Sequence, residues 1–438
     1  MKRIIVFIVM ALSCIGVKSQ NIDERIGAAM NSSDFFCLYD IYYSTPKDSI
    51  DPFLEVFSRC MIGNRFNRPD ISIPAFDELL KSHADNLDMN LLLQSSIMYA
   101  MDLNRVGRNE DAYNVLTAVL ASAYQVTDSA NIATYANFAA QYKALADYSP
   151  YQISIAGERG IIPFDTISAG KTGSEQYLMQ ITDAKINGID ANVTFDTGAG
   201  VNVINESQAN AYDLVFLDAK VAATGVETTA GRYAIAKNLT LGNITVKDVP
   251  FYVLDISSHH EEADKYSSVY EIIVGSELML QLKDVTLDFS AKEIQIASDS
   301  YEPSGVRPNM FFSSDMNLLT SAEINSKPII IKLDSGDASY GRLNKAFFEE
   351  NKDYLTSSCK SDTINQAGVG GVWSVLCYKL QNASLTIGDN SVILPIVQVQ
   401  TEQQESGYLD YNNLGLKSMM LFNKIHFNLV DMLFTTEL

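Results

Sequence analysis

Basic residues, histidine and cysteine are scarce in this sequence, and each shortage narrows the classes of function. Lysine and arginine total 32 against 53 aspartates and glutamates, which gives a formal net charge of −21. Such a chain repels phosphate backbones and anionic headgroups, so nucleic acid is not expected as a partner. His259 and His260 are neighbours, but they lack the His-Glu-x-x-His spacing of a zinc site. Because a phosphate-binding glycine loop and a Ser, His and Asp constellation are also missing, we expect no metal and no cofactor.

Long apolar runs are absent beyond the start of the chain. Lys2 and Arg3 precede an apolar run at residues 4–12, which is too short to span a bilayer as a stable helix. This pattern is typical of a secretory signal peptide, here residues 1–19. A retained N-terminal anchor and lipidation of Cys14 are the alternatives. We therefore expect an exported protein, periplasmic, cell-surface or secreted, that is soluble after signal cleavage unless a lipid anchors it.

Cysteine is rare, and four of the five cysteines follow the expected signal peptide. They form two close pairs along the chain, Cys37 with Cys60 and Cys359 with Cys377. In an oxidising compartment two local disulfides fit this spacing, although four cysteines allow three pairings. Free buried thiols are the alternative interpretation.

The first part of the chain has a helical pattern. Apolar residues recur at three- and four-residue spacing from residue 20 to about residue 151. Four residues resemble the turn between the two helices of a tetratricopeptide-type unit: Ala100, Leu103, Gly107 and Ala112. We predict a helical domain with its linker at 20–165, the linker being Pro150 and 157–163. Its role is open between a partner-binding module, an inhibitory prosegment and a stabilising cap.

After residue 165 the pattern changes to short alternating strands rich in Val, Ile, Thr and Tyr, which are separated by turn residues. This part contains an internal repeat. Residues 184–200 align with residues 322–338, and the alignment places Asp196 over Asp334.

Three later blocks of the repeat follow in the same order. The matched residues are Leu239 with Leu385, Pro250 with Pro395, and Gly275 with Gly415. Their offsets differ only by loop lengths, so chance is a poor explanation. We predict two copies of one β-unit, at 166–303 and 304–438.

Each copy ends an apolar strand with Asp, then Thr or Ser, then Gly. A single Asp-Thr-Gly is an ordinary turn sequence, but two copies packed about a twofold axis would bring Asp196 and Asp334 together. Two carboxylates a few ångström apart share one proton and titrate as a pair. Such a pair supplies a general base for a water that attacks a peptide carbonyl, and a general acid for the leaving amine.

The neighbours of the two aspartates have matching roles in this hypothesis. Gly198 and Gly336 allow a tight turn, so that backbone amides point at the carboxylates. The hydroxyls of Thr197 and Ser335 are expected to form hydrogen bonds across to the opposite copy.

On these motifs, residues 176–438 resemble two fused retropepsin-like aspartic protease units, in the bilobal arrangement of pepsin-like enzymes. The two apolar residues followed by glycine at 273–275, and less closely 413–415, belong to the same resemblance. It implies a helical domain followed by a bilobal, mainly β double barrel with pseudo-twofold symmetry. It also implies an aspartic endopeptidase that binds a peptide or protein substrate as an extended strand beneath flaps.

The flap candidates are residues 225–233 in the first copy and 367–373 in the second. The residues expected to contact substrate are Gly225, Tyr233, Gly370 and Trp373. Ordinary hairpins with surface aromatics are the alternative.

Two residues depart from the pattern of the resembled family. Asp337 follows the second Asp-Ser-Gly where a small residue is usual, and Asn413 stands in place of an apolar residue. A third carboxylate facing the pair would raise its proton affinity. The second hypothesis is therefore a catalytically inactive peptide-binding or surface-interaction protein that keeps the protease fold.

Overall fold

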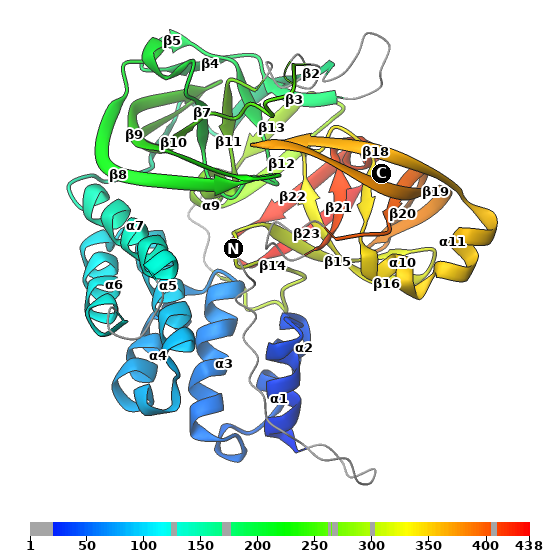
Figure 1. Cartoon of the computed structure of the whole chain (residues 1–438). Helices are drawn as coiled ribbons and strands as arrows, with labels where there is room; N and C mark the ends of the chain where they lie inside the picture. Colours follow the sequence, from blue (N-terminus) through cyan, green and yellow to red (C-terminus); the bar gives the residue numbers. More distant parts are fainter. Residues whose placement is uncertain are drawn as a thin grey trace. The chain divides into compact units, whose positions relative to one another are not determined.

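The computed structural model (Figure 1) describes residues 21–123, 129–168, 177–261, 264, 270–297, 303–403 and 410–438. The chain divides into two compact units, with the boundary between Tyr148 and Ser149. The predicted signal peptide and Cys14 lie outside the described residues. Among the described helices, none is long and apolar enough to cross a membrane.

The first unit is helical. Three helices begin at an aspartate whose carboxylate accepts a backbone N–H of the first turn, namely Asp34, Asp51 and Asp88. Such caps satisfy amides that have no partner within the helix. The described helices are α1 (Ile22–Asn31), α2 (Phe35–Ser44), α3 (Pro52–Arg65), α4 (Pro69–Ser82), α5 (Met89–Arg105), α6 (Asn109–Ala123) and α7 (Ser129–Leu145), with 3-10 turns at Lys47–Ser49 and Ala84–Asn86.

Two helical hairpins of this unit share a turn sequence. Asn-Arg-x-x-Arg occurs at 64–68, between α3 and α4, and again at 104–108, between α5 and α6. Each turn has one residue in the left-handed region, Asn67 with φ of 52° and Gly107 with φ of 76°. Glycine and asparagine adopt this conformation with the least strain. The turn predicted at Gly107 is present, and a related turn precedes it.

The second unit is built mainly of β-strands, which form a sheet of 15 strands and a sheet of 8 strands in the described residues. The first sheet runs β23 (Leu433–Glu437), β22 (Lys424–Asn428), β12 (Asp284–Asp288), β13 (Glu293–Ile296), β2 (Gly160–Ser168), β3 (Tyr177–Ile181), β6 (Val193–Phe195), β11 (Ile272–Val274), β7 (Val203–Asn205), β10 (Ile244–Leu254), β9 (Thr228–Leu241), β4 (Ala184–Ile186) and β5 (Ile189–Asp190), with β1 (Gln152–Ile155) beside β10 and β8 (Val215–Thr224) beside β9. The second sheet runs β14 (Met310–Phe312), β15 (Leu318–Ile324), β16 (Lys327–Asp334), β21 (Asn412–Gly415), β17 (Gly341–Leu343), β20 (Asn390–Gln400), β19 (Gly371–Ile387) and β18 (Lys360–Gly368). The described helices of this unit are α9 (Ser276–Leu282), α10 (Lys345–Glu350), α11 (Lys352–Ser358) and α12 (Leu416–Met419), and a 3-10 turn lies at Ala209–Ala211.

Each sheet contains a parallel pair of strands that leads into one of the candidate aspartates. β6 pairs with β11 so that Phe195 lies opposite Val274, and β16 pairs with β21 so that Leu333 lies opposite Leu414. These four opposed residues are fully buried, as expected for parallel strands that are covered on both faces. The strands that lead to the two aspartates thus have equivalent parallel partners in the two sheets.

The last two strands of the chain join the sheet of the first copy. β22 pairs antiparallel with β12, with Asp284 opposite Asn428, and β23 pairs with β22. The final repeat block of each copy therefore pairs with its own counterpart. The boundary predicted at 303/304 separates the copies along the chain but not within this sheet.

The linker predicted at 157–163 belongs in part to a strand. β2 begins at Gly160, and Pro163 lies opposite Glu293 of β13. β1, just before it, pairs with β10. Glycine and proline content favoured a linker, but pairing with strands far along the chain decides the structure here.

The interpretation of the cysteines as two disulfides is wrong for this structure, because all four described cysteines are free. Cys60 and Cys377 are buried, whereas Cys37 and Cys359 are partly exposed. Burial raises the pKa of Cys377 to about 11 and raises the pKa of Cys60 well above its ordinary value. Protonated, buried thiols of this kind are unreactive.

Candidate active site

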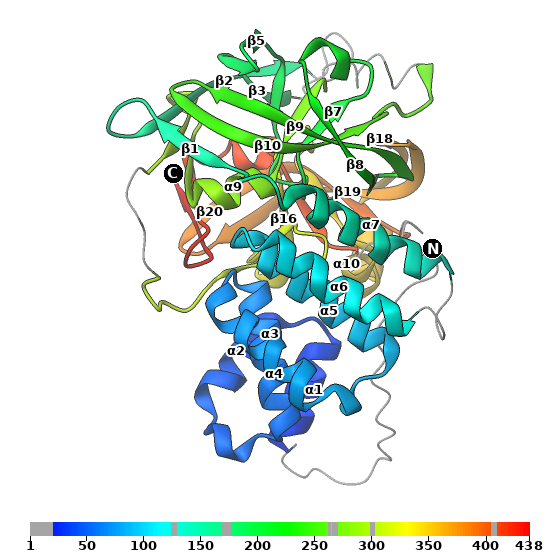
Figure 2. The same cartoon turned by 90° about the vertical axis from the view of Figure 1, so that its left-hand side faces the viewer.

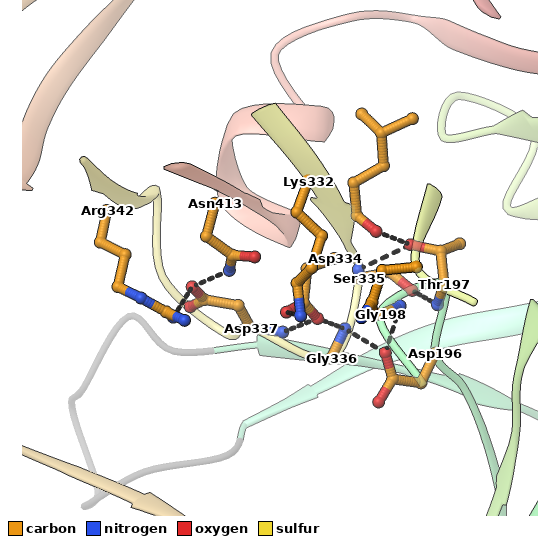
Figure 3. Close-up of polar contacts among 12 residues, drawn as sticks. Asp196, Thr197, Gly198, Lys332, Asp334, Ser335, Gly336, Asp337, Arg342 and Asn413 are labelled. Carbon is orange, nitrogen blue, oxygen red and sulfur yellow. Dashed lines mark hydrogen bonds and ion pairs between the residues drawn. The ribbon is translucent and has the colours of Figure 1, made fainter. Parts of the chain in front are cut away.

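The structure brings Asp196 and Asp334 together. Asp196 directly follows β6, and Asp334 is the last residue of β16. The backbone N–H of Gly336 lies 3.1 Å from Oδ1 of Asp196 and 3.1 Å from Oδ1 of Asp334, so one amide bridges the two carboxylates (Figure 3). The N–H of Gly198 donates a further hydrogen bond of 2.8 Å to Oδ1 of Asp196.

Each of the two glycines lies so close to the carboxylate of the opposite copy that no side chain fits there. A Cβ atom on Gly198 would lie 2.2 Å from Oδ1 of Asp334, and a Cβ on Gly336 would lie 2.3 Å from Oδ2 of Asp196. Their amides do point at the carboxylates, as the sequence predicts. Neither glycine, however, is among the residues with positive φ. Close approach rather than turn geometry therefore excludes a side chain.

Reciprocal hydrogen bonds connect Thr197 and Ser335. The Oγ of Ser335 accepts the Thr197 N–H at 3.0 Å and donates to the carbonyl of Phe195 at 2.8 Å. The Oγ1 of Thr197 accepts the Ser335 N–H at 3.0 Å and donates to the carbonyl of Leu333 at 2.9 Å. Both side chains are fully buried. These four bonds fix the spacing of the strands that carry the aspartates.

The two carboxyl groups have opposite pKa shifts. Burial, followed by the charge of Asp334, raises the pKa of Asp196 to about 7. Burial also acts on Asp334, but Lys332, Arg342 and Asn413 outweigh it and hold the pKa of Asp334 below its ordinary value. Opposite shifts of this kind are expected for two neighbouring acids that share one proton.

Asp337 and Asn413, the two departures from the resembled pattern, interact with each other (Figure 3). The side-chain amide of Asn413 donates to Oδ2 of Asp337 at 2.7 Å, and Oδ1 of Asp337 accepts the N–H and the hydroxyl of Ser339. The Asp337 carboxylate is thus held by its own partners. Its backbone N–H donates to Oδ1 of Asp334 at 3.1 Å, so the chain at this position still supports the pair.

The predicted flap segments are two hairpins whose tips touch. Figure 2 shows an end of β8 near β18. The N–H groups of Val226 and Glu227 both donate to the carbonyl of Val369, at 2.9 and 3.2 Å. A Cβ on Gly225 would lie 2.8 Å from this carbonyl oxygen, and Gly370 has φ of 83° in the turn.

The two aromatic flap candidates lie in different surroundings. Tyr233 is 3% exposed, and its ring meets that of Tyr252 edge to face, so it packs inside the first copy. Trp373 is partly exposed on β19, opposite Gln366 of β18.

Two residues beside the pair were missed in the sequence. Lys332 forms an ion pair with Asp334, with Nζ 2.7 Å from Oδ2. A lysine within the apolar run of β16 is a signal that could have identified it. The hydroxyl of Tyr270 donates to the carbonyl of Gly336 at 3.3 Å, and burial together with the nearby carboxylates raises the pKa of Tyr270. The role of Tyr270 could not be predicted from the sequence around it, because its hydrogen-bond partner belongs to the other copy.

No metal site is found within the described ranges, where no group of three or more His, Cys, Asp or Glu side chains could hold an ion. His259 contacts the hydroxyl of Ser257 at 3.1 Å.

Comparison with known families supports this interpretation for the first copy. A family model described as aspartyl protease matches residues 182–277. The matched range contains Asp196, its Thr-Gly turn, the first hairpin and the start of α9. No curated protein matches the sequence significantly. The first copy therefore has an aspartyl protease-like sequence, which supports a protease-like function.

Proposed function

We propose that the protein is an aspartic endopeptidase in which Asp196 and Asp334 act as one catalytic pair. The observation that carries the proposal is the N–H of Gly336 shared by both carboxylates at 3.1 Å. Two acids held this closely share a proton, which is the state that general acid–base hydrolysis requires.

The chemistry follows from that shared proton. The ionised carboxylate takes a proton from a bound water as the water oxygen attacks the peptide carbonyl carbon. The protonated carboxyl donates to the carbonyl oxygen, and a proton then passes to the leaving amine as the C–N bond breaks. Thr197 and Ser335 contribute by keeping the two strands in register, since their four hydrogen bonds are buried and reciprocal.

The substrate in this proposal is an extended peptide bound beneath the two hairpins. An extended chain satisfies its backbone groups by pairing with strand edges. The hydrogen bonds from Val226 and Glu227 to Val369 close the tips. We expect the tips to separate when a peptide enters and to close again over it.

A second candidate is a protein that binds peptides without cleaving them. Lys332 favours it, because its ammonium group occupies Oδ2 of Asp334 at 2.7 Å. Under this alternative the ion pair prevents Asp334 from accepting a proton from water, rather than only lowering its pKa.

The test is cleavage of a denatured protein mixture across about pH 3 to 8, the range in which carboxylate pairs titrate. Asp196→Asn and Asp334→Asn should each lower the rate by at least about 100-fold, which is the low end of a general acid–base contribution. Asp190→Asn is the matched control, because Asp190 is exposed in an ion pair with Lys185.

Two results would contradict the endopeptidase proposal. One is wild-type protein that cleaves nothing in this range. The other is cleavage that persists in Asp196→Asn. Peptide binding by a wild-type protein without cleavage would support the second candidate.

A further inference from the structure

The two copies differ at the residue two positions before each aspartate. The first copy has Thr194, which is fully buried and whose hydroxyl has no hydrogen-bond partner in the described residues. The second copy has Lys332, whose Nζ lies 2.7 Å from Oδ2 of Asp334. The side chain of Lys332 is 18% exposed and that of Asp334 is 13% exposed, so solvent screens this ion pair only weakly.

We propose that Lys332 is a positioning residue that assigns the roles in the pair: it keeps Asp334 as the carboxylate that accepts a proton from water, and it leaves the proton on Asp196. This inference rests on the proposed endopeptidase function and deepens it. Two identical acids would share a proton with equal probability, and a cation in contact with one of them removes that equivalence.

The hydrogen bonds of Asp196 agree with this assignment. From the described residues Asp196 accepts two hydrogen bonds, from Gly198 and Gly336, and both go to Oδ1. Its Oδ2 therefore remains for the proton. Asp334 accepts the amides of Gly336 and Asp337 at Oδ1 and the ammonium of Lys332 at Oδ2, which is the environment of an ionised carboxylate.

The other charged and titratable groups around the pair act less directly. A guanidinium nitrogen of Arg342 lies 3.9 Å from Oδ2 of Asp337, so the Asp337 carboxylate partly neutralises the charge of Arg342. Asp337 is also held by Asn413 at 2.7 Å. Tyr270, whose hydroxyl donates to the carbonyl of Gly336, has a pKa that is raised by burial and by the nearby carboxylates, so it stays neutral. Among the residues that the structure describes, Lys332 is thus the cation that forms an ion pair with one of the two aspartates.

The assignment has a consequence for the pH range of activity. The singly protonated pair exists between the pKa of Asp334 and the pKa of Asp196. An opposite charge in contact lowers the pKa of an aspartate by about 1 to 3 units. Lys332 therefore extends the active range toward low pH, and its loss should move the acid limb upward.

The experiment compares the pH dependence of kcat/KM in wild type, Lys332→Met and Lys332→Arg, using the full chain. Methionine keeps the length of the side chain and removes its charge, whereas arginine keeps the charge. We expect the acid limb of Lys332→Met to move up by about 1 to 3 pH units and that of Lys332→Arg to stay near wild type. An unchanged acid limb in Lys332→Met would overturn the inference, as would an equal shift in Lys332→Arg.

A second measurement separates this inference from the proposed function. The carboxyl carbons of Asp196 and Asp334 can be titrated by NMR in ¹³C-labelled protein, assigned through Asp196→Asn and Asp334→Asn. The lower-pKa carboxyl should be Asp334 in wild type, and its pKa should rise in Lys332→Met. If wild type titrates in this way but cleaves no peptide, the endopeptidase proposal fails while Lys332 keeps its effect on the pair. If Asp196 is the lower-pKa group, the inference is wrong whether or not the protein cleaves.

Discussion

The Asp196 copy and the Asp334 copy are alike where they touch and differ immediately beside the contact. Thr197 and Ser335 exchange equivalent hydrogen bonds, and each glycine of the turn meets the opposite carboxylate. The differences cluster in the second copy, at Lys332, Asp337 and Asn413, which correspond to Thr194, Ala199 and Ile273 in the repeat.

This contrast shows which positions the packing of two copies restricts. A residue that contacts its own counterpart must suit both sides of the interface, so the turns have kept the same chemistry. A residue that contacts only its own copy has no such restriction. The second copy uses this freedom to surround one carboxylate with charged and polar groups.

The largest expected effect comes from giving either turn a side chain. Gly336→Ala and Gly198→Ala place a Cβ 2.3 and 2.2 Å from a carboxylate oxygen, so each must push the acids apart. We expect at least about a 100-fold loss of kcat/KM from either substitution, as general acid–base catalysis is lost. Gly27→Ala is the control, because nothing lies within 4 Å of its Cβ position. If one turn accepts alanine with full activity, the equivalence of the two turns is wrong.

The next effect is on stability. Thr197→Val and Ser335→Ala each leave a buried N–H and a buried carbonyl of the opposite copy without their partner. Each group left unpaired costs about 1 to 3 kcal/mol of the free energy of unfolding. Urea denaturation should show similar losses for the two variants, and Thr197→Ser should lose little. A large loss for one variant alone would mean that the two copies do not depend on each other equally.

The third prediction compares how Asp196 and Asp334 contribute to the free energy of unfolding as pH changes. The raised pKa of Asp196, about 7, means that the folded state binds its proton more tightly than the unfolded state. This contribution is fully present at low pH and is lost as pH rises toward 7. Asp334 has the opposite shift, so its contribution is present above the ordinary pKa of an aspartate and is lost in acid.

Neutral substitutions should therefore act with opposite sign at pH 7.5. Asp196→Asn should raise the free energy of unfolding, at about 1.4 kcal/mol for each pKa unit of the lost shift, and should matter little at pH 4. Asp334→Asn should lower it, because Lys332 is left without its partner. Equal changes in both variants, measured by denaturation at the two pH values, would contradict the opposite shifts.

The sequence predicted a helical part and a β part, the repeat, and the two Asp-Thr/Ser-Gly turns that meet in the structure. It could do so because both Asp-Thr/Ser-Gly turns are local motifs and because the repeat places one over the other. The reason for Gly198 and Gly336 was not predictable from local sequence, since the atoms that exclude a side chain there belong to the other copy.

The features that were missed also depend on distant partners. The predicted linker at 157–163 includes the start of β2, because glycine and proline content is visible locally, whereas the pairing of β2 with β13 is not. The pairing of β22 with β12 in the first sheet likewise joins residues that are far apart along the chain. Lys332 could have been found, because comparing the copies for differences rather than matches isolates it at once.

The smallest expected effect comes from a substitution that makes the second copy more like the first. Asp337→Ala introduces the residue of the matching position, Ala199, and leaves the backbone N–H that supports Asp334 in place. We expect kcat/KM to change by less than about threefold, a small fraction of a general acid–base contribution, because the Asp337 carboxylate is held by Asn413 and Ser339.

Stability should nevertheless fall in Asp337→Ala, because Asn413 is 2% exposed and loses the acceptor of its amide. A buried group left in this way costs about 1 to 3 kcal/mol. Adding Asn413→Ile, the residue of the first copy, should recover most of that loss, since replacing both partners by apolar groups is close to neutral. A double-mutant cycle measures the coupling. Additive losses would show that Asp337 and Asn413 act separately, and a large loss of kcat/KM in Asp337→Ala would place this carboxylate among the groups that tune the pair.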